Sequence, residues 1–496
     1  MTSLLTRPAT QPVHITERSG WTTSTWILLV VLCGALFLDG LDISMVGVAL
    51  PSIGAELAME PSSLQWIVSG YVLGYGGLLL LGGRVSDLLG RRQVFLAAAA
   101  VFGIASVVSA TVSDPSTLIA LRFVKGVAAA FTVPSGLSII TTTFAEGPAR
   151  SRALSIYTVC GASGFSMGLV FGGVLTEVGW RATMLLPGPL ALLVFAVGWL
   201  VIPRAERAPF RFAHFDLTGA ITSTGALLLL VWAVVQAPEV GWTSYRTLSA
   251  LAASVLLAAA FLVTERRHAH PLVRLGIVRS LHIAHANVIG FVMFGSYAAF
   301  QFVVTLYLQD VLGWSPLAMA LGFLPAGLLV VASATMMDSV MERIGTPRLI
   351  AVGMAAFVGG YLLFLRAEAG MAYAAFLLPT ILLLGVGFAL CFPSINSQAT
   401  SGVHDDEQGL ASGLVNTSVQ IGGAVTLAVV TAILGSAHGG DPSTTLPGMG
   451  SAVTLVSVLT GVGLALTIVF VALQARRRPV GERGVDVEQP DRRVEA

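Results

Sequence analysis

Long apolar runs follow one another along almost the whole chain, and they constrain its fold more than any other feature. A helix that spans a membrane needs about 20 consecutive, mostly apolar residues. The segments between the runs are short. The sequence therefore predicts an all-α polytopic membrane protein with 14 transmembrane helices and no soluble domain between them. The runs lie near residues 26–50, 64–82, 93–112, 117–143, 153–175, 183–202, 217–236, 246–264, 283–308, 317–337, 347–366, 371–393, 409–435 and 452–474.

The overall composition excludes several classes of protein. Hydrophobic residues make up 55% of the 496 positions and charged residues only 11%, whereas soluble globular chains carry about 25% charged residues. The formal net charge is +1, and no Lys/Arg-rich tract with interleaved aromatic residues occurs, which argues against a nucleic-acid partner. Cys33, Cys160 and Cys391 are far apart and lack metal-ligand spacing. We expect no metal site and no cofactor.

The basic residues predict how the chain is oriented in the membrane. Cytoplasmic loops carry an excess of Lys and Arg. With the N-terminus inside, only Arg181, Arg246 and Arg366 of the 27 Lys and Arg fall in outer segments. The first run is longer than the core of a signal peptide, so it should remain as a span. We expect a multi-pass protein of the plasma (inner) membrane with both termini cytoplasmic, a tail over 1–25 and a disordered tail over 475–496.

Two pairs of charged residues lie inside apolar runs. Arg122 and Lys125 are three residues apart in the fourth run, and Asp39 and Asp42 have the same spacing in the first. An ionised side chain at bilayer depth costs about 2.5–3.5 kcal/mol on insertion scales. At 1.5 Å per residue, the acids lie ~12–16 Å and the cations ~8–12 Å from the outer ends of their spans. Matching depth favours ion pairing, since pairing lowers the cost of burial.

The loop between spans two and three carries a family signature. Its sequence, Gly83-Arg-Val-Ser-Asp-Leu-Leu-Gly-Arg-Arg92, resembles the G-x-x-x-D-R-x-G-R-R motif of the major facilitator superfamily, with Leu88 where that family usually has Arg. In that family the acid and its basic partners clamp neighbouring helices when the transporter faces outward. The resemblance implies this role for Asp87, Arg91 and Arg92, with Gly83 and Gly90 permitting the turn.

A weaker copy of the loop, Glu342-Arg343-Ile344-Gly345, follows span ten. Glu342 takes the place of Asp87, and Gly345 that of Gly90. Internal duplication of six-span halves is the architecture of this superfamily. We therefore expect a major facilitator fold of two six-helix halves plus two inserted helices. The expected segments are the two halves, 26–202 and 265–474, and a cytoplasmic loop with the inserted pair, 203–264.

Three further stretches resemble the fourteen-helix drug:proton antiporters of the same superfamily. They are the span-one motif from Asp42 to Pro51, an R-x-x-Q-G-like motif from Arg122 to Gly126, and a glycine motif in span five. Lys125 stands where the second motif usually has Gln, and Leu169 stands where the third has Pro. Small residues at every fourth position let two helices approach closely, and in the family this glycine motif is associated with exporters. Its glycines are Gly164, Gly168, Gly172 and Gly173.

The four intramembrane charges suggest a means of proton coupling. Burial favours the protonated form of a carboxyl group, and an adjacent cation favours the ionised form. In our hypothesis Asp42 is the leading proton carrier, and Asp39 is a relay or a site for a cationic substrate. Arg122 keeps the acid ionised in one conformation. Lys125 either loses its own proton or pairs with an acidic substrate group. The alternative is a buried charge cluster that only fixes helix packing.

A substrate cavity is expected between the halves near the middle of the membrane, with apolar walls and few polar anchors. Amide side chains of the second half are the candidates for these anchors, although each could instead make an interhelical hydrogen bond. The candidates are Asn287, Gln301, Asn396, Asn416 and Gln420.

These features predict a proton-coupled antiporter that exports small amphiphilic drugs or secondary metabolites by alternating access. We expect a monomer that is not an enzyme. A proton-coupled importer on the same fold is the main alternative. A membrane-embedded transferase would need a catalytic site in a sizeable loop, and a sensor would need a signalling domain. The identity of the substrate stays open.

Overall fold

The computed structural model describes residues 21–145, 148–204, 216–267, 276, 280–334, 336–366, 372–401, 403, 408–437 and 446–477. Most of both expected tails therefore lies outside the described residues. The helices are α1 (Thr23–Leu57), α2 (Pro61–Leu89), α3 (Arg91–Ser109), α4 (Pro115–Thr143), α5 (Pro148–Val178), α6 (Trp180–Leu185), α7 (Pro187–Val201), α8 (Leu217–Val240), α9 (Tyr245–Arg267), α11 (Leu281–Leu306), the π-turn η3 (Tyr307–Val311), α12 (Pro316–Ala334), α13 (Met337–Ile344), α14 (Thr346–Phe364), α15 (Leu377–Thr400), α16 (Gln408–Ser436) and α17 (Met449–Arg477).

Fourteen of these segments are long and apolar enough to cross a membrane, with α6 joined to α7 and α11 joined to η3. The predicted fold class is confirmed. Several helices extend beyond their predicted runs, and α15 is shifted at both ends, since it starts at Leu377 rather than at 371 and continues to Thr400 rather than ending at 393. The added residues include Ser394 and Gln398, which are buried against protein. A prediction that counts apolar residues along the sequence ends a span too early where polar side chains face other helices instead of lipid.

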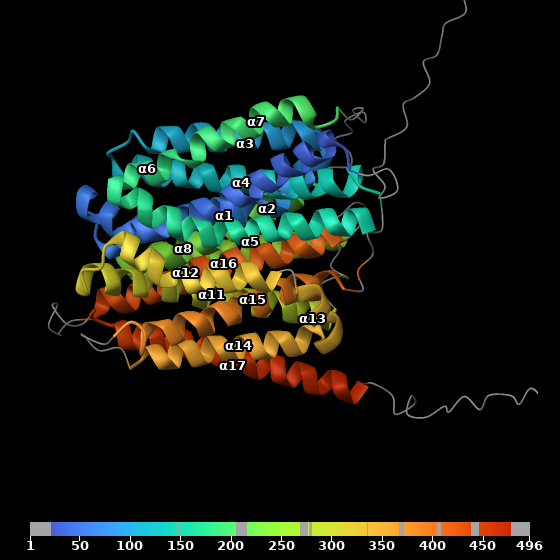
Figure 1. Cartoon of the computed structure of the whole chain (residues 1–496). Coiled ribbons are helices and arrows are strands. Elements are labelled where there is room, and N and C mark those ends of the chain that lie inside the picture. Colours follow the sequence, from blue (N-terminus) through green and yellow to red (C-terminus); the bar gives the residue numbers. More distant parts are fainter. Residues whose placement is uncertain are drawn as a thin grey trace, which may run out of the picture.

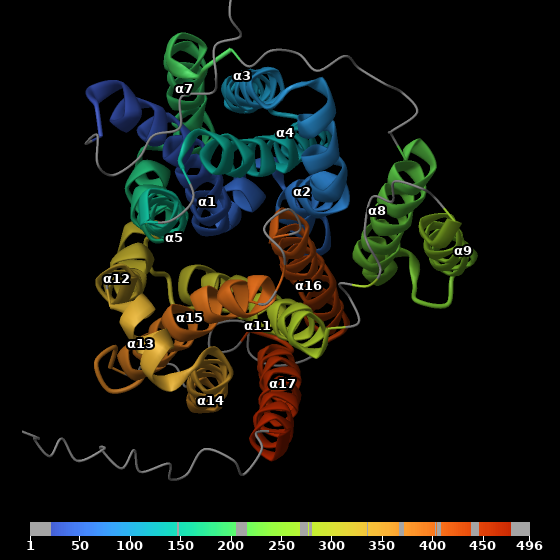
Figure 2. The same cartoon turned by 90° about the vertical axis from the view of Figure 1, so that its right-hand side faces the viewer.

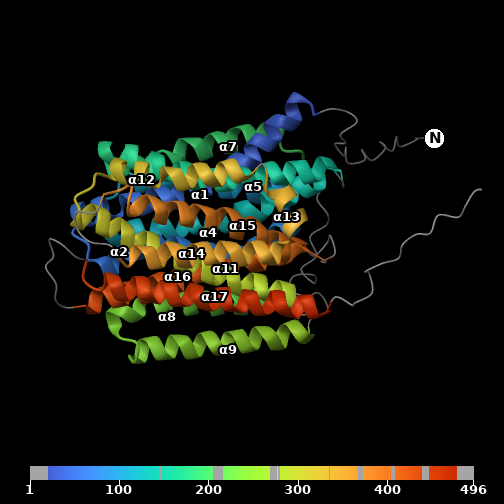
Figure 3. The same ribbon diagram turned by 60° about the horizontal axis from the view of Figure 1, so that its bottom comes forward.

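The helices form two groups with a peripheral pair. Figure 2 shows α1 to α7 on one side and α11 to α17 on the other, with α8 and α9 beside α2 and α16. Helix α8 packs on α2, on α16 and on α9, and Figures 2 and 3 both place α9 outside α8. The start of α1 and the end of α17 lie at the same end of the bundle (Figure 1).

Two helix pairs make most of the contact between the groups, α5 with α12 and α2 with α16. Gly173 on α5 lies so close to α12 that an added Cβ would overlap the Cβ of Ala320. On the other side, a Cβ at Gly76 of α2 would lie 2.9 Å from the Cβ of Gln420 on α16. Backbones at these two places approach as closely as glycine allows, so the two halves meet in direct contact.

The glycines of span five set the position of α1. Added Cβ atoms at Gly164 and Gly168 would overlap backbone oxygens of Phe37 and Leu41 or lie very close to them, and one at Gly172 would lie 2.9 Å from the Cα of Met45. Each step of four residues on α5 matches a step of four on α1. The stripe of small residues therefore holds α1 against α5 at three points over about two helical turns.

The two copies of the loop motif share an unusual backbone conformation. Gly90 has φ 99° and ψ 120°, and Gly345 has φ 87° and ψ 142°. Residues with a Cβ rarely adopt such positive φ values, whereas glycine does so freely. Each glycine ends one helix and starts the next, α2 to α3 and α13 to α14. The same turn at corresponding places supports the internal repeat.

Candidate proton-coupling site and central cavity

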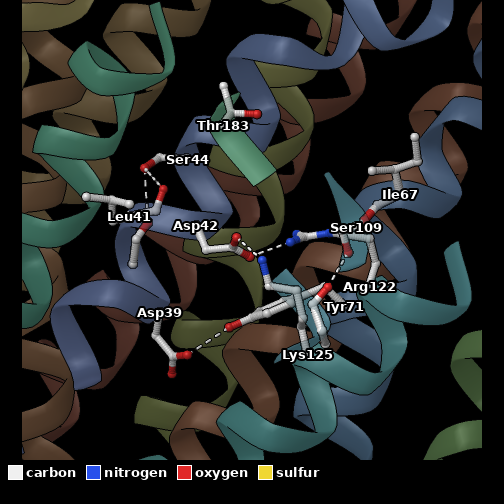
Figure 4. A network of polar contacts seen from close by, with 12 residues as sticks. Asp39, Leu41, Asp42, Ser44, Ile67, Tyr71, Ser109, Arg122, Lys125 and Thr183 are labelled. Atoms are coloured by element: carbon white, nitrogen blue, oxygen red, sulfur yellow. Dashed lines mark hydrogen bonds and ion pairs between the residues drawn. The ribbon is translucent and has the colours of Figure 1, made fainter. Parts of the chain in front are cut away.

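Asp42 on α1 is held between two cations of α4. Arg122 donates through Nη1 to Asp42 Oδ2, and Lys125 donates through Nζ to Asp42 Oδ1, so each carboxylate oxygen faces one cation (Figure 4). Asp42 and Lys125 have no exposed surface, and Arg122 has 1%. The spacing of three residues places both cations on one face of α4. The structure thus brings together three of the four predicted charged residues.

Further contacts fix the two cations in place. The Nε of Arg122 donates to the carbonyl oxygen of Ile67 on α2 at 3.0 Å, and its guanidinium lies 4.7 Å from the ring centre of Tyr71. The Nζ of Lys125 lies 4.8 Å from the ring centre of Phe102 on α3. Cations over aromatic faces gain electrostatic stabilisation where water is excluded. Four helices therefore build the environment of Asp42.

Asp39 lies one turn away and contacts neither cation by an ion pair. Its Oδ1 accepts a hydrogen bond from the Tyr71 hydroxyl at 3.1 Å, while its Oδ2 is buried without a hydrogen-bond partner. Figure 4 shows Tyr71 reaching from the side of Arg122 to Asp39. Tyr71 thus contacts Asp39 through its hydroxyl and Arg122, the partner of Asp42, through its ring.

Sequence reasoning missed Tyr71, Phe102 and the Ile67 carbonyl. Tyr71 and Tyr75 are aromatic residues with hydroxyl groups, four apart in an otherwise apolar run. A hydroxyl buried at this depth needs a polar partner, so these two tyrosines were a signal in the sequence that could have indicated a polar site. Nothing in the local sequence marks Phe102 or Ile67, because their roles depend on how α3 and α2 pack against α4.

A cavity lies between the two halves. Its walls come from α1, α2, α5, α11 and α16, and two of the predicted anchors, Gln301 and Gln420, belong to them. A second, smaller cavity lies between α5, α11, α12 and α15. Phe165 and Tyr297 line both, so these two rings separate them.

The three predicted asparagines line neither of these two cavities. Their amide nitrogens donate to carbonyls one turn earlier on the same helix, from Asn287 to Ile283, from Asn396 to Phe392 and from Asn416 to Ser412. Asn287 also accepts a hydrogen bond from Ser418 on α16 at 2.7 Å. The bond between Ser418 and Asn287 joins two helices, as the packing alternative expects, whereas the bonds of Asn396 and Asn416 stay within their own helices.

The residues of the loop motif lie at the end where the chain enters α3. The Nη2 of Arg92 donates to the carbonyl oxygen of Trp199 at 2.6 Å, and its guanidinium lies 5.2 Å from the Trp199 ring centre. This contact ties the start of α3 to the end of α7. Arg91 is the first residue of α3, and a Cβ at Gly83 would lie 3.7 Å from Pro134 on α4. The side chain of Asp87 lies outside the described residues.

The protein is a polytopic helix bundle in which charged residues are buried between the helices and a cavity lies at the junction of two halves. These features define the class of membrane transporters. A family model described as the Major Facilitator Superfamily matches residues 32–427. The chain therefore belongs to this superfamily.

Named relatives support this assignment. The chain is 35% identical over 469 residues to the cephamycin export protein CmcT of Amycolatopsis lactamdurans, covering 94% of this chain and 96% of that protein. It is 34% identical over 488 residues to the puromycin resistance protein pur8 of Streptomyces alboniger, covering 95% and 96%. Among solved structures, a peptide transporter POT in complex with sulfate superposes with a TM-score of 0.66 at 15% identity, covering 90% of this chain and 94% of that one. This last likeness concerns the fold alone.

Proposed function

We propose that this protein exports small amphiphilic compounds in exchange for protons. The observation that carries the proposal is the placement of Asp42 between Arg122 and Lys125, sealed from solvent. The relatives named for cephamycin export and puromycin resistance support the direction of transport and the kind of substrate.

The mechanism rests on the charge of Asp42. In the arrangement described here both of its oxygens face cations, which favours the ionised form. When the halves rearrange and α1 shifts relative to α4, the carboxylate loses these partners and binds a proton. Release follows when the cations return. Asp39, linked to the site through the Tyr71 hydroxyl, serves as a relay.

We also propose the following topology and oligomeric state. Both termini lie in the cytoplasm, the plasma membrane holds a monomer, and residues 26–202 and 265–474 form the halves around the inserted segment 203–264. The Arg92 contact with Trp199, together with Asp87 and Arg91, stabilises one of the two transport states.

Proton coupling is tested in inside-out membrane vesicles with an acidified lumen, using puromycin and chloramphenicol as substrates. Addition of a substrate should release lumenal protons, followed by acridine-orange fluorescence, in the wild type. The Asp42→Asn variant should lose this response. Asp114→Asn is the matched control, since Asp114 caps α4 outside the bundle and Asn caps helices as well as Asp does.

Two outcomes would contradict the proposal. Undiminished, pH-dependent transport by Asp42→Asn would remove Asp42 from proton coupling. Uptake of substrate by right-side-out vesicles, with none by inside-out vesicles, would favour the importer. Where the single variant is too unstable, Asp42→Asn with Lys125→Gln keeps the charge of the site balanced and answers the same question.

A further inference from the structure

The cavity between the halves has no charge on its walls. It is lined by residues of α1, α2, α5, α11 and α16, and among these described residues none is acidic or basic. Asp39, Asp42, Arg122 and Lys125 are not part of the lining. Asp42 and Lys125 direct their charges at each other, so neither offers a free counter-ion to a bound molecule.

Six side chains with polar groups line the cavity, and two of these groups are satisfied by their own helix. Ser44 Oγ donates to the Gly40 carbonyl oxygen at 3.0 Å, and Thr305 Oγ1 donates to the Gln301 carbonyl oxygen at 2.8 Å. Hydroxyl groups in helices commonly bond to a carbonyl one turn earlier in this way. These two side chains have little hydrogen-bonding capacity left for a ligand.

Two of the remaining four polar groups of the lining have no partner. Ser69 Oγ on α2 and Gln420 Oε1 on α16 are both buried without a hydrogen-bond partner, and the two residues are 0% and 6% exposed. Ser69 offers a hydroxyl that can donate, and Gln420 an oxygen that accepts. They come from opposite halves. A buried polar group without a partner is costly, and a molecule that supplies the missing donor and acceptor would remove that cost.

We propose that this cavity binds an uncharged amphiphile that carries both a hydrogen-bond donor and an acceptor, held between Ser69 and Gln420, and that it discriminates against organic cations. The assignment rests on the proposed transport function and names its substrate class. The rest of the lining is mostly apolar and suits the body of such a molecule. A cation entering the same space would lose its hydration without gaining a counter-charge, which is far more costly than burying a satisfied hydroxyl.

This assignment departs from the expectation that Asp39 could receive a cationic substrate. Asp39 is not part of the cavity lining, and the Tyr71 hydroxyl already occupies one of its oxygens. The selectivity of the cavity therefore comes from uncharged groups.

The test compares two probes of similar shape that differ in charge. Triphenylmethanol is neutral and carries a hydroxyl that both donates and accepts, whereas methyltriphenylphosphonium is a permanent cation of the same size. Equilibrium dialysis against the full chain in lipid nanodiscs, with empty nanodiscs subtracted, gives the dissociation constants. We expect triphenylmethanol to bind at least tenfold more tightly.

Four variants test which side chains determine the preference for the neutral probe. Ser69→Ala and Gln420→Leu should each weaken triphenylmethanol binding about 3- to 10-fold, the ordinary effect of one lost hydrogen bond, and leave the cation unchanged. Gln420→Glu places a carboxylate in the cavity and should reverse the preference. Ser44→Ala is the matched control, because it removes a lining hydroxyl that already bonds to its own helix, and it should change binding less than twofold.

Two results would overturn the assignment. One is equal or tighter binding of the cation to the wild type. The other is an effect of Ser69→Ala and Gln420→Leu no larger than that of Ser44→Ala. Both results come from dissociation constants measured at equilibrium without a proton gradient, so they can be distinguished from a failure of proton coupling. Binding as expected with no proton release in vesicles would instead contradict the proposed function alone.

Discussion

At the scale of single residues, the charge balance around Asp42 decides stability as well as coupling. Two acids and two cations lie within a few turns of α1 and α4, and all four are at least 95% buried. Their charges cancel when both acids are ionised. A buried pair that loses one partner leaves a charge without compensation, which costs about 3–5 kcal/mol. Any single substitution here therefore changes the net charge of a sealed site.

The first prediction follows from this balance. Asp42→Asn leaves both cations with only Asp39 nearby, and should lower the free energy of unfolding by about 3–5 kcal/mol. Adding Lys125→Gln removes the excess charge and should recover at least half of that loss. Thermal unfolding in detergent compares the wild type, both single variants and the double variant. A double variant less stable than Asp42→Asn would show that charge balance does not govern the site.

A second prediction concerns the tyrosine between the acids. Tyr71→Phe keeps the ring beneath Arg122 but removes the donor to Asp39, which should cost about 1–3 kcal/mol because a buried acceptor loses its partner. Tyr75→Phe is the control, since the structure records no hydrogen bond for its hydroxyl and its ring lies 6.0 Å from that of Tyr71. Thermal unfolding should separate the two variants. Equal effects would indicate that the hydrogen bond to Asp39 contributes nothing.

The sequence predicts this site only in part. Residue counts along α1 and α4 give the depths of Asp42, Arg122 and Lys125, because a helix rises by a fixed 1.5 Å per residue. Residue counts do not show in which direction each face of a helix points, or which helix packs against it. The bond from Arg122 to the Ile67 carbonyl and the ring of Phe102 beneath Lys125 depend on both. Asp39 accordingly shares the predicted depth but pairs with neither cation.

At the scale of helices, small residues set the closest approaches. Gly164, Gly168 and Gly172 face α1, whereas the neighbouring Gly173 faces α12. The pattern of every fourth residue predicted close packing but did not name the partners. It also assigned all four glycines to one motif, although the last of them serves a different interface. Two adjacent residues of a helix point about 100° apart, so they contact different neighbours.

The third prediction tests this packing. Gly164→Ala places a Cβ against the Phe37 carbonyl oxygen, so α1 must move, at a cost of about 1–3 kcal/mol for overpacking. Gly461→Ala on α17 is the control, since nothing lies within 4 Å of its added Cβ and Ala favours helix by up to about 1 kcal/mol. Melting temperatures in detergent should fall for the first variant and hold or rise for the second. A fall of equal size in both would show that the effect does not arise from contact with α1.

At the scale of the whole molecule, the fourteen spans and the repeated loop were predictable. Hydropathy and span length decide the number of helices, and the matched turns at Gly90 and Gly345 reflect a repeat that the sequence still carries. The pairing of α5 with α12 and of α2 with α16 was not predictable. It depends on contacts between residues about 150 or more positions apart, such as Gly173 with Ala320. The same holds for the place of α8 and α9 beside the junction.

The end of the bundle where α5 finishes is closed across the two halves. Leu317 on α12 donates its backbone N–H to Glu177 on α5 at 3.3 Å, and Gln309 on η3 donates to the Val48 carbonyl oxygen on α1 at 3.0 Å. Gly173 lies within this contact. Alternating access requires these contacts to separate in the opposite state, so a side chain that cannot fit at Gly173 should favour separation.

The last prediction uses this contact to shift the balance between states. A Cβ at Gly173 would overlap Ala320 and lie 2.9 Å from the Pro316 carbonyl oxygen, whereas the atoms nearest to one at Gly172 belong to Met45 and Val48 on α1 of the same half. Gly173→Ala should therefore open this end, and Gly172→Ala should not. The reporter is Leu50→Cys, a cavity-lining position that is 2% exposed, with the three native cysteines replaced by alanine.

Labelling of intact cells with a membrane-impermeant maleimide measures the shift. Each 1.4 kcal/mol of strain in the closed arrangement should raise the open population, and with it the labelling rate, roughly tenfold until that state dominates. A faster rate in Gly173→Ala alone supports separation of the halves at this end and places it outside the cell. If both variants are labelled faster by the same factor, the effect reflects loosened packing within one half. Unchanged labelling in Gly173→Ala would mean that α5 and α12 stay in contact throughout the transport cycle.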